Sequence, residues 1–165
     1  MVALGLLVAG CGSQISSASP SSAVGDASRV DMCTILTGHE LTQLGTKLGS
    51  REPVNELGSV GCQWLGTRIT LDLERDKETL ASYRHRRNSP TFTSFVDNTV
   101  NGRPGAHLSV RSDRSDCDQL MDGGPVSLSV AVAQAGEYDG PPIDSCAEAM
   151  RIAQMIEPRL PKAGS

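Results

Sequence analysis

The chain has 165 residues and a formal net charge of −4 at pH 7. Its basic residues are scattered along the chain, which argues against a nucleic-acid-binding protein because such proteins carry a basic stripe. With only two Phe, two Tyr and one Trp, the core must be built mainly from aliphatic residues and Met.

The N-terminus has the pattern of a lipid-anchored exported protein. Val2 to Ala9 form an unbroken run of apolar and small residues that ends at Gly10-Cys11, and serine-rich sequence follows at once. The run is too short to span a bilayer as a helix, and it is more typical of a signal peptide than of a buried strand or helix. An apolar run closed by small residues and a cysteine matches a lipobox. We therefore expect residues 1–10 to be a signal peptide and Cys11 to carry fatty acyl chains such as palmitate.

This expected lipid places the remaining chain at the extracytoplasmic face of the cell membrane. Signal peptides begin with a positively charged region, and the first residues lack one, so we expect the true translation start to lie upstream. Residues 11–29 are rich in serine and poor in bulky apolar groups, which predicts a disordered tether. A single domain is expected over residues 30–161, with a short tail at residues 162–165.

Four further cysteines, Cys33, Cys62, Cys117 and Cys146, make an even number in an exported chain, which predicts two disulfides. No C-x-x-C pair occurs, which argues against a zinc site or a thioredoxin-like redox site. Four cysteines allow three connectivities. We favour Cys33–Cys62 and Cys117–Cys146, because each pair joins a predicted helix to a nearby predicted strand.

The first elements are short. Asp31 can cap a helical turn at the start of the domain. Thr37 and Glu40 then form a capping box for a small helix, and Gly45 is a natural terminator for it. Lys47 to Ser59 is polar and contains Gly and Pro, so we interpret it as a loop or an irregular edge.

Alternating apolar residues predict the next strands. Val60–Trp64 and Ile69–Leu73 each alternate with period two, and Gly66-Thr67 between them suggests a hairpin. The period-two pattern places Trp64 in the core beside Cys62 rather than on a binding surface. Lys77–Arg87 has helical character before Pro90, and Phe92–Val100 is a further β region.

The second half predicts two hairpins and a helix. Asn101-Gly102 is the strongest hairpin signal in the chain, because both residues accept the positive φ of a type I′ turn, and it joins Phe92–Val100 to Arg103–Val110. Ser112–Asp116 is a charged turn, and Cys117–Met121 pairs with Val126–Ala133. Ser145 and Glu148 suggest a capping box for the longest helix. An apolar stripe at helical spacing follows, made of Cys146, Ala149, Met150, Ala153 and Ile156.

The order of elements predicts an α+β domain. Tight turns imply an antiparallel sheet of about five to six strands, packed by two to three helices and held by two disulfides.

The landmarks in order resemble an actinobacterial lipoprotein family, the domain of unknown function 3558 family. They are the lipobox at Cys11, the serine-rich tether, Asp31-Met32-Cys33-Thr34-Ile35-Leu36-Thr37, Cys62-Gln63-Trp64, Asn101-Gly102-Arg103-Pro104-Gly105-Ala106, Cys117, and Cys146 in a helix that ends at Leu160-Pro161. Met32 is a departure, since the family often has proline there. The resemblance implies a cell-envelope lipoprotein and no chemistry. More loosely, the chain is similar to the extracytoplasmic sensor domains of mycobacterial receptor kinases.

No residue pattern predicts an active site. None of the serines lies in a Gly-x-Ser-x-Gly elbow, and His39, His85 and His107 stand in unrelated sequence contexts, with His107 expected to face solvent. Arg84, Arg86 and Arg87 are a possible anion-binding cluster, although a solvated helix end explains them better.

Four aspartates lie close together in the sequence: Asp113, Asp116, Asp118 and Asp122. They lack the spacing of a calcium loop, and we interpret them as turn-forming residues. No cofactor or metal is predicted.

We therefore predict a non-enzymatic, membrane-anchored module that binds a small molecule or an envelope protein, and not nucleic acid. Two alternatives remain. A carrier of small apolar molecules would need an apolar cavity between helix and sheet. An envelope hydrolase would need a histidine within hydrogen-bond reach of a serine and an aspartate.

Overall fold

The computed structural model describes residues 24–110 and 116–162. The expected signal peptide, the expected lipidation site Cys11 and most of the expected tether lie outside these ranges. None of the described helices is long and apolar enough to cross a membrane.

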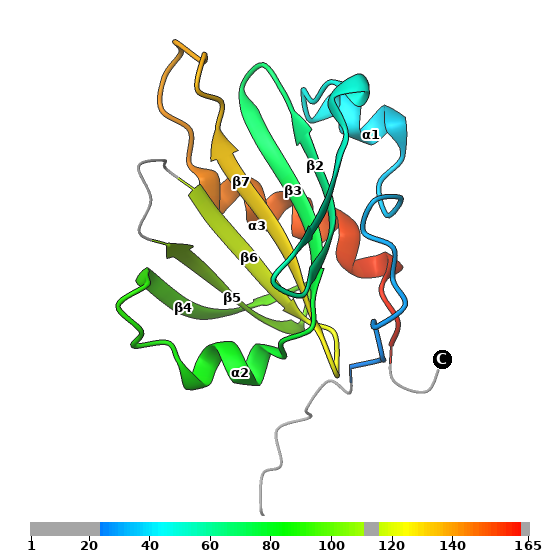
Figure 1. The fold of residues 1–165 in the computed structure, drawn as a ribbon, viewed down its shortest axis with the longest axis vertical. Coiled ribbons are helices and arrows are strands. Elements are labelled where there is room, and N and C mark those ends of the chain that lie inside the picture. The colour runs from blue at the N-terminus through cyan, green and yellow to red at the C-terminus, as the bar shows by residue number, and fades with distance from the viewer. Residues whose placement is uncertain (1–23, 111–115, 163–165) are drawn as a thin grey trace, which may run out of the picture.

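The domain is built on one antiparallel sheet of seven strands in the order β1-β2-β3-β7-β6-β5-β4 (Figure 1). The strands are β1 (Glu52–Glu56), β2 (Ser59–Leu65), β3 (Ile69–Asp76), β4 (Phe92–Val100), β5 (Arg103–Val110), β6 (Asp116–Asp122) and β7 (Ser127–Gln134). The α+β prediction is confirmed, but the predicted strand number was too low. The interpretation of Lys47–Ser59 as a loop or an irregular edge did not identify β1 as a strand, because β1 has no buried residue and so lacks an apolar alternation.

Three α-helices accompany the sheet: α1 (Gly38–Gln43), α2 (Leu80–His85) and α3 (Ser145–Ile156). Short 3₁₀ turns follow α1 at Leu48–Ser50 and α3 at Glu157–Arg159. The Thr37–Glu40 capping box of α1 is confirmed. The predicted cap of α3 was wrong by one residue.

Asp144 caps α3, and its carboxylate accepts a hydrogen bond of 3.0 Å from the Ala147 N–H. Ser145 is therefore the first helical residue. A carboxylate is as good an N-cap as a hydroxyl, and Asp144, one residue earlier, takes the role that was predicted for Ser145. Glu148 does not complete a capping box here but pairs with Arg68 and Arg151.

Different helices pack on the two faces of the sheet. In Figure 1, α3 crosses behind the sheet, where its apolar stripe packs on β6 and β7. Ile152, Leu128 and Val130 have no exposed surface in this interface. On the opposite face α2 covers only one part, where Leu80 packs with Leu108 and Leu120. The remaining part of that face, over β1, β2, β3 and β7, has no helix among the described residues.

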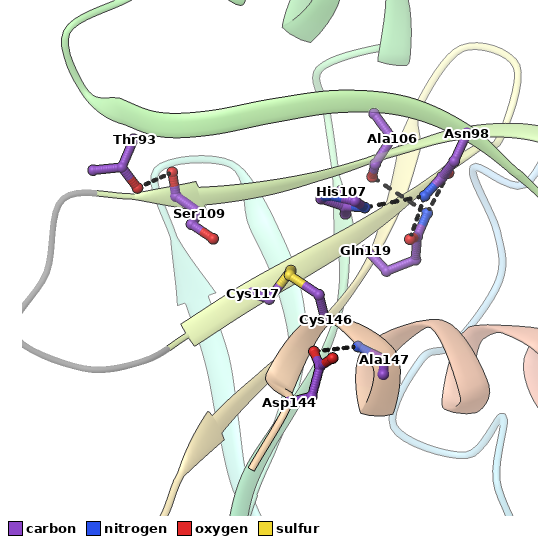
Figure 2. Close-up of a disulfide and its surroundings, with 10 residues drawn as sticks. All are labelled: Thr93, Asn98, Ala106, His107, Ser109, Cys117, Gln119, Asp144, Cys146 and Ala147. Carbon is purple, nitrogen blue, oxygen red and sulfur yellow. Dashed lines mark hydrogen bonds between the residues drawn. A yellow bond between two sulfur atoms is a disulfide. The ribbon is translucent and has the colours of Figure 1, made fainter. Parts of the chain in front are cut away.

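Two disulfides link this framework. Cys33–Cys62 joins the N-terminal segment to β2, and Cys117–Cys146 joins β6 to the first turn of α3 (Figure 2). These are the two pairs favoured from the sequence. Trp64 is buried next to the first disulfide, at 1% exposure, as its alternation predicted.

The first described residues pair with the C-terminal segment and with the β6–β7 turn. Val24 forms a β-bridge with Lys162, and the Ala27 N–H donates to the Gly123 carbonyl over 2.9 Å. Ala27 is fully buried. Residues 24–29 therefore belong to the domain, and the expected tether boundary at residue 29 was too late. Sequence reasoning missed this segment, because a single buried alanine in a serine-rich stretch makes no apolar pattern.

Two hairpin turns place non-glycine residues at positive φ. Asn101-Gly102 has φ values of 50° and 89°, which confirms the predicted type I′ turn. Leu57-Gly58, between β1 and β2, has φ values of 50° and 98°. Asn is a preferred residue at such a position and Leu is not. Leu57 is also 97% exposed, so it gains no burial in return.

We expect Leu57→Asn to stabilise the fold by about 0.5–1 kcal/mol, because it relieves the left-handed backbone of an apolar residue. Urea denaturation of the two proteins measures this difference. The exchange Asn101→Leu, at the equivalent place in the other hairpin, should have the opposite sign. A destabilised Leu57→Asn protein would show that Leu57 makes a native contact that the turn geometry does not reveal.

Candidate functional site

The uncovered part of the sheet carries acidic residues at alternate positions. On β3, Ile69, Leu71 and Leu73 point into the core beneath α3, so the residues between them point to the opposite face. These are Thr70, Asp72, Glu74 and Asp76. On β6, Asp116 and Asp118 point the same way, because Cys117 between them points to α3.

Strand β7 lies between these two acidic strands and presents only small side chains on this face: Ser129, Ala131 and Ala133. Because β3 and β6 are two strand spacings apart, their carboxylates stand about 10 Å from each other across this floor. The result is a hollow of about 350 Å³. We call it the acidic groove, defined by the carboxylates Asp72, Glu74, Asp76, Asp116 and Asp118 around the floor of β7.

The groove has an end wall and an extension. Tyr83 of α2 closes it beside Asp76, to which the phenol donates a hydrogen bond of 2.5 Å. Burial, followed by this hydrogen bond, raises the pKa of Tyr83, so the phenol stays protonated. In the other direction a second hollow of about 300 Å³ continues over β1 and β2. Glu52 and Glu56 line it, together with Asp72 and Glu74.

Burial and the closeness of other carboxylates raise the pKa of two carboxyl groups in the groove. Burial, and then the nearby carboxylates of Asp116, Glu74 and Asp72, raise the pKa of Asp118 to about 7. Burial and the neighbouring Asp72 also raise the pKa of Glu74. Among the described residues, none donates a hydrogen bond to the Asp118 carboxylate, and the charged groups that act on it are carboxylates. Its ionised form is therefore poorly supported by the protein itself, and a cation in the groove would stabilise it.

The groove does not have the geometry of a metal centre. Within residues 24–110 and 116–162, no three His, Cys, Asp or Glu side chains converge closely enough to hold one metal ion. The carboxylates are spread along strands instead, as the period of a sheet requires. Such a surface suits a ligand with several separated positive charges better than a single ion.

Removing the Asp118 charge should change how stability depends on pH. Since its pKa is raised from 3.8 to about 7, the folded state holds a proton between these pH values that the unfolded state has released. The free energy of unfolding should therefore fall as pH rises through this window, at up to about 1.4 kcal/mol per pH unit. Asp118→Asn should remove this fall, so that the variant is the more stable protein above pH 7.

Thermal or urea unfolding of both proteins over the same pH series measures the effect. The difference between the two curves isolates the effect of Asp118 from that of groups whose contribution to stability rises with pH. Glu40 is such a group, because hydrogen bonds from Arg159 and Thr37 lower its pKa to about 2. Parallel curves for the two proteins would rule out a raised Asp118 pKa.

The three arginines of the possible anion-binding cluster form ion pairs with carboxylates in the structure. Arg84 and Arg87 both pair with Asp97, at 2.6 and 3.1 Å. Arg86 pairs with Glu78 at 2.6 Å, and its guanidinium lies over the Tyr83 ring. Each arginine therefore already has a carboxylate partner, as expected for a solvated helix end.

The three histidines lie on different elements. His39 is in α1 and His85 ends α2, and both are exposed. His107 on β5 is half-buried rather than facing solvent, and its Nδ1 lies 3.5 Å from the Asn98 amide (Figure 2). That amide is paired with the buried Gln119, which makes this a structural cluster. In the part of the chain that the structure describes, no histidine bonds to a serine or an aspartate, so the hydrolase alternative gains no support.

The carrier alternative also gains no support where it was expected. Ala149, Ile152 and Ile156 of α3 meet Val130 and Leu128 of the sheet with no exposed surface on any of them. Close packing of this kind leaves no room at these residues for an apolar ligand.

Sequence reasoning missed the groove because it assigned its aspartates to turns. Asp116, Asp118 and Asp122 belong to strand β6, and Asp113 lies outside the described residues. A signal was present in the alternation of acidic and apolar residues on Ile69–Asp76. Its meaning depended on β3 pairing with β7, the hairpin partner of β6, and the sequence does not specify that pairing.

Comparison with known proteins places the chain in a family. Residues 6–159 match the family described as "Protein of unknown function (DUF3558)". No curated protein and no solved structure matches the chain. The match covers nearly the whole chain, as the landmarks in the sequence predicted, and the chain therefore belongs to the DUF3558 family.

Proposed function

We propose that this protein is a non-enzymatic binding module of the cell envelope, anchored by a lipid on Cys11, and that its ligand site is the acidic groove. The observation that carries the binding proposal is the groove itself. It combines a hollow, a floor of small side chains and carboxylates on both sides.

The charge of the groove specifies the kind of ligand. Its lining offers carboxylates with raised pKa values at Asp118 and Glu74, and these ionise more readily beside a cation. The two acidic walls stand about 10 Å apart. We therefore expect a ligand with two or more positive groups, such as a polyamine or a basic segment of an envelope protein.

Calorimetric titration with spermidine, a trivalent cationic probe, tests the site. We expect binding that weakens with added salt and is lost in Asp72→Asn/Asp118→Asn. The matched control Glu137→Gln/Asp139→Asn removes the same net charge from exposed residues outside the groove, and it should bind like the wild type. Equal affinity in both double variants would assign the binding to net charge and refute a specific site.

The anchor is supported by the apolar run before Cys11 and by two disulfides, which are typical of exported proteins. Cys11→Ser should release the protein from the membrane fraction of cells that express it. Unchanged fractionation of the variant would refute the anchor. This result is independent of the spermidine titration, so the two parts of the proposal can fail separately.

A further inference from the structure

The tip of the β1–β2 hairpin combines two unfavourable features. Leu57 is the most exposed large apolar residue within the described ranges, at 97%, and it occupies a left-handed backbone position. The chain uses asparagine for the same position of its other type I′ turn, at Asn101. An exposed leucine with a left-handed backbone contributes neither to the stability of the fold nor to solubility. This indicates that the Leu57 side chain has a role in contacting another molecule or surface.

The register of the sheet places this tip at the end where the chain departs toward Cys11. Ser59, at the base of the tip, pairs with Asp76, Asp76 with Ser127, and Ser127 with Asp122. The next residue, Gly123, holds Ala27. The tip is therefore three strand spacings, about 14 Å, from the place where the N-terminal segment meets the sheet. In Figure 1 both lie in the lower half of the view.

The length of chain that precedes the described residues limits how far the domain stands from its anchor. Cys11 precedes Val24 by 13 residues, a span of at most about 45 Å when fully extended. A chain anchored at Cys11 therefore keeps Val24 within about 45 Å of the bilayer, so the tip, which lies at the same end of the sheet, is able to reach the membrane. The β2–β3 turn lies at the opposite end of the sheet from the tip.

The surroundings of Leu57 match a lipid surface. Lys77 lies against Gly58, so that a side chain added at Gly58 would collide with it, and Lys77 is exposed. An apolar side chain beside a lysine is a common arrangement at membrane interfaces, where the ammonium meets lipid phosphates. The neighbouring carboxylate Glu56 lines the hollow over β1 and β2 and so turns away toward the groove face.

We propose that Leu57 inserts into the bilayer that holds the chain, so that the β1–β2 hairpin fixes the orientation of the domain on the membrane. This inference rests on the proposed anchor at Cys11. Insertion of Leu57 would explain why the turn keeps an apolar residue at a left-handed position. The acidic groove, which lies on a face of the sheet, would then stay accessible to ligands that diffuse along the membrane.

Tryptophan fluorescence on vesicles tests the insertion. The chain from Cys11 onward is coupled through this thiol to a maleimide lipid in vesicles of phosphatidylcholine and phosphatidylglycerol, so that anchoring does not depend on acylation in cells. Leu57→Trp then reports contact with acyl chains, since Trp64 is buried at 1% exposure and contributes a constant background. Leu65→Trp is the matched control, because Leu65 is also exposed, at 46%, and lies at the end of β2 that is away from the tip.

We expect brominated acyl chains to lower the emission of the Leu57→Trp protein about two-fold, as for a side chain below the headgroups, and to leave the Leu65→Trp protein nearly unchanged. If brominated acyl chains leave the emission of the Leu57→Trp protein as unchanged as that of the Leu65→Trp protein, the proposal is overturned and a protein partner for the tip is favoured. If wild-type protein is not membrane-bound in cells while the Leu57→Trp protein is quenched on vesicles, the acylation of Cys11 fails and the lipid affinity of the tip stands.

Discussion

Replacing Arg103 by methionine should lower the free energy of unfolding by about 3–5 kcal/mol, because it leaves a buried carboxylate without its partner. The Arg103 side chain is 4% exposed, and its Nε lies 3.3 Å from the Glu157 carboxylate, which is 9% exposed. The same guanidinium donates to the carbonyls of Asp122 and Pro161, each over 2.8 Å. Arg103 thus joins β5, the β6–β7 turn and the C-terminal segment, and urea denaturation measures its contribution.

Two comparisons make this prediction specific. Arg103→Met/Glu157→Met removes both charges and should recover most of the loss, since a buried pair replaced by apolar residues is often neutral. Arg68→Met removes an exposed partner of Glu148 and should cost less than about 1 kcal/mol. If Arg103→Met and Arg68→Met lower the free energy of unfolding by the same amount, the buried ion pair does not stabilise the fold as its contacts indicate.

Removing the disulfide between Cys117 and Cys146 should cost about 3–4 kcal/mol, because the unfolded chain regains the entropy of an open loop of about 30 residues. This disulfide holds β6, one wall of the acidic groove, to the first turn of α3. Denaturation of Cys117→Ala/Cys146→Ala under oxidising conditions measures the loss.

The other disulfide provides the matched control. Cys33–Cys62 has the same sequence separation of 29 residues, so loop entropy predicts an equal loss for Cys33→Ala/Cys62→Ala. Losses below about 1 kcal/mol in both variants would contradict the chain-entropy account. A loss in one variant alone would show that local packing, and not loop entropy, sets the value.

Local sequence signals were sufficient for most of the fold. The Asn101-Gly102 turn, the Thr37–Glu40 capping box and the buried face of β3 each depend on residues within a few positions of one another. Strand β1 was not predicted because none of its side chains is buried, so it has no apolar alternation. The buried alanine at position 27 escaped for a similar reason, since its environment comes from the distant Gly123.

The candidate site depends on long-range pairing and could not be predicted in the same way. β3 pairs with β7 across more than fifty residues of sequence, and this pairing brings Asp72 into register with Asp118 across Ala131, with Glu74 two residues farther along β3. Each acidic residue alone has the appearance of a solvated strand or turn position. Only the sheet order turns them into two walls of one groove.

The pKa of Asp118 is the most direct measure of whether the acidic groove receives a cation. Carbon-13 NMR of the side-chain carboxyl, followed over pH, should give a pKa of about 7 for the protein alone. With saturating spermidine the pKa should fall, because a bound ammonium group favours the ionised carboxylate. A pKa that spermidine leaves unchanged, in a protein that remains folded, would contradict the groove as the ligand site.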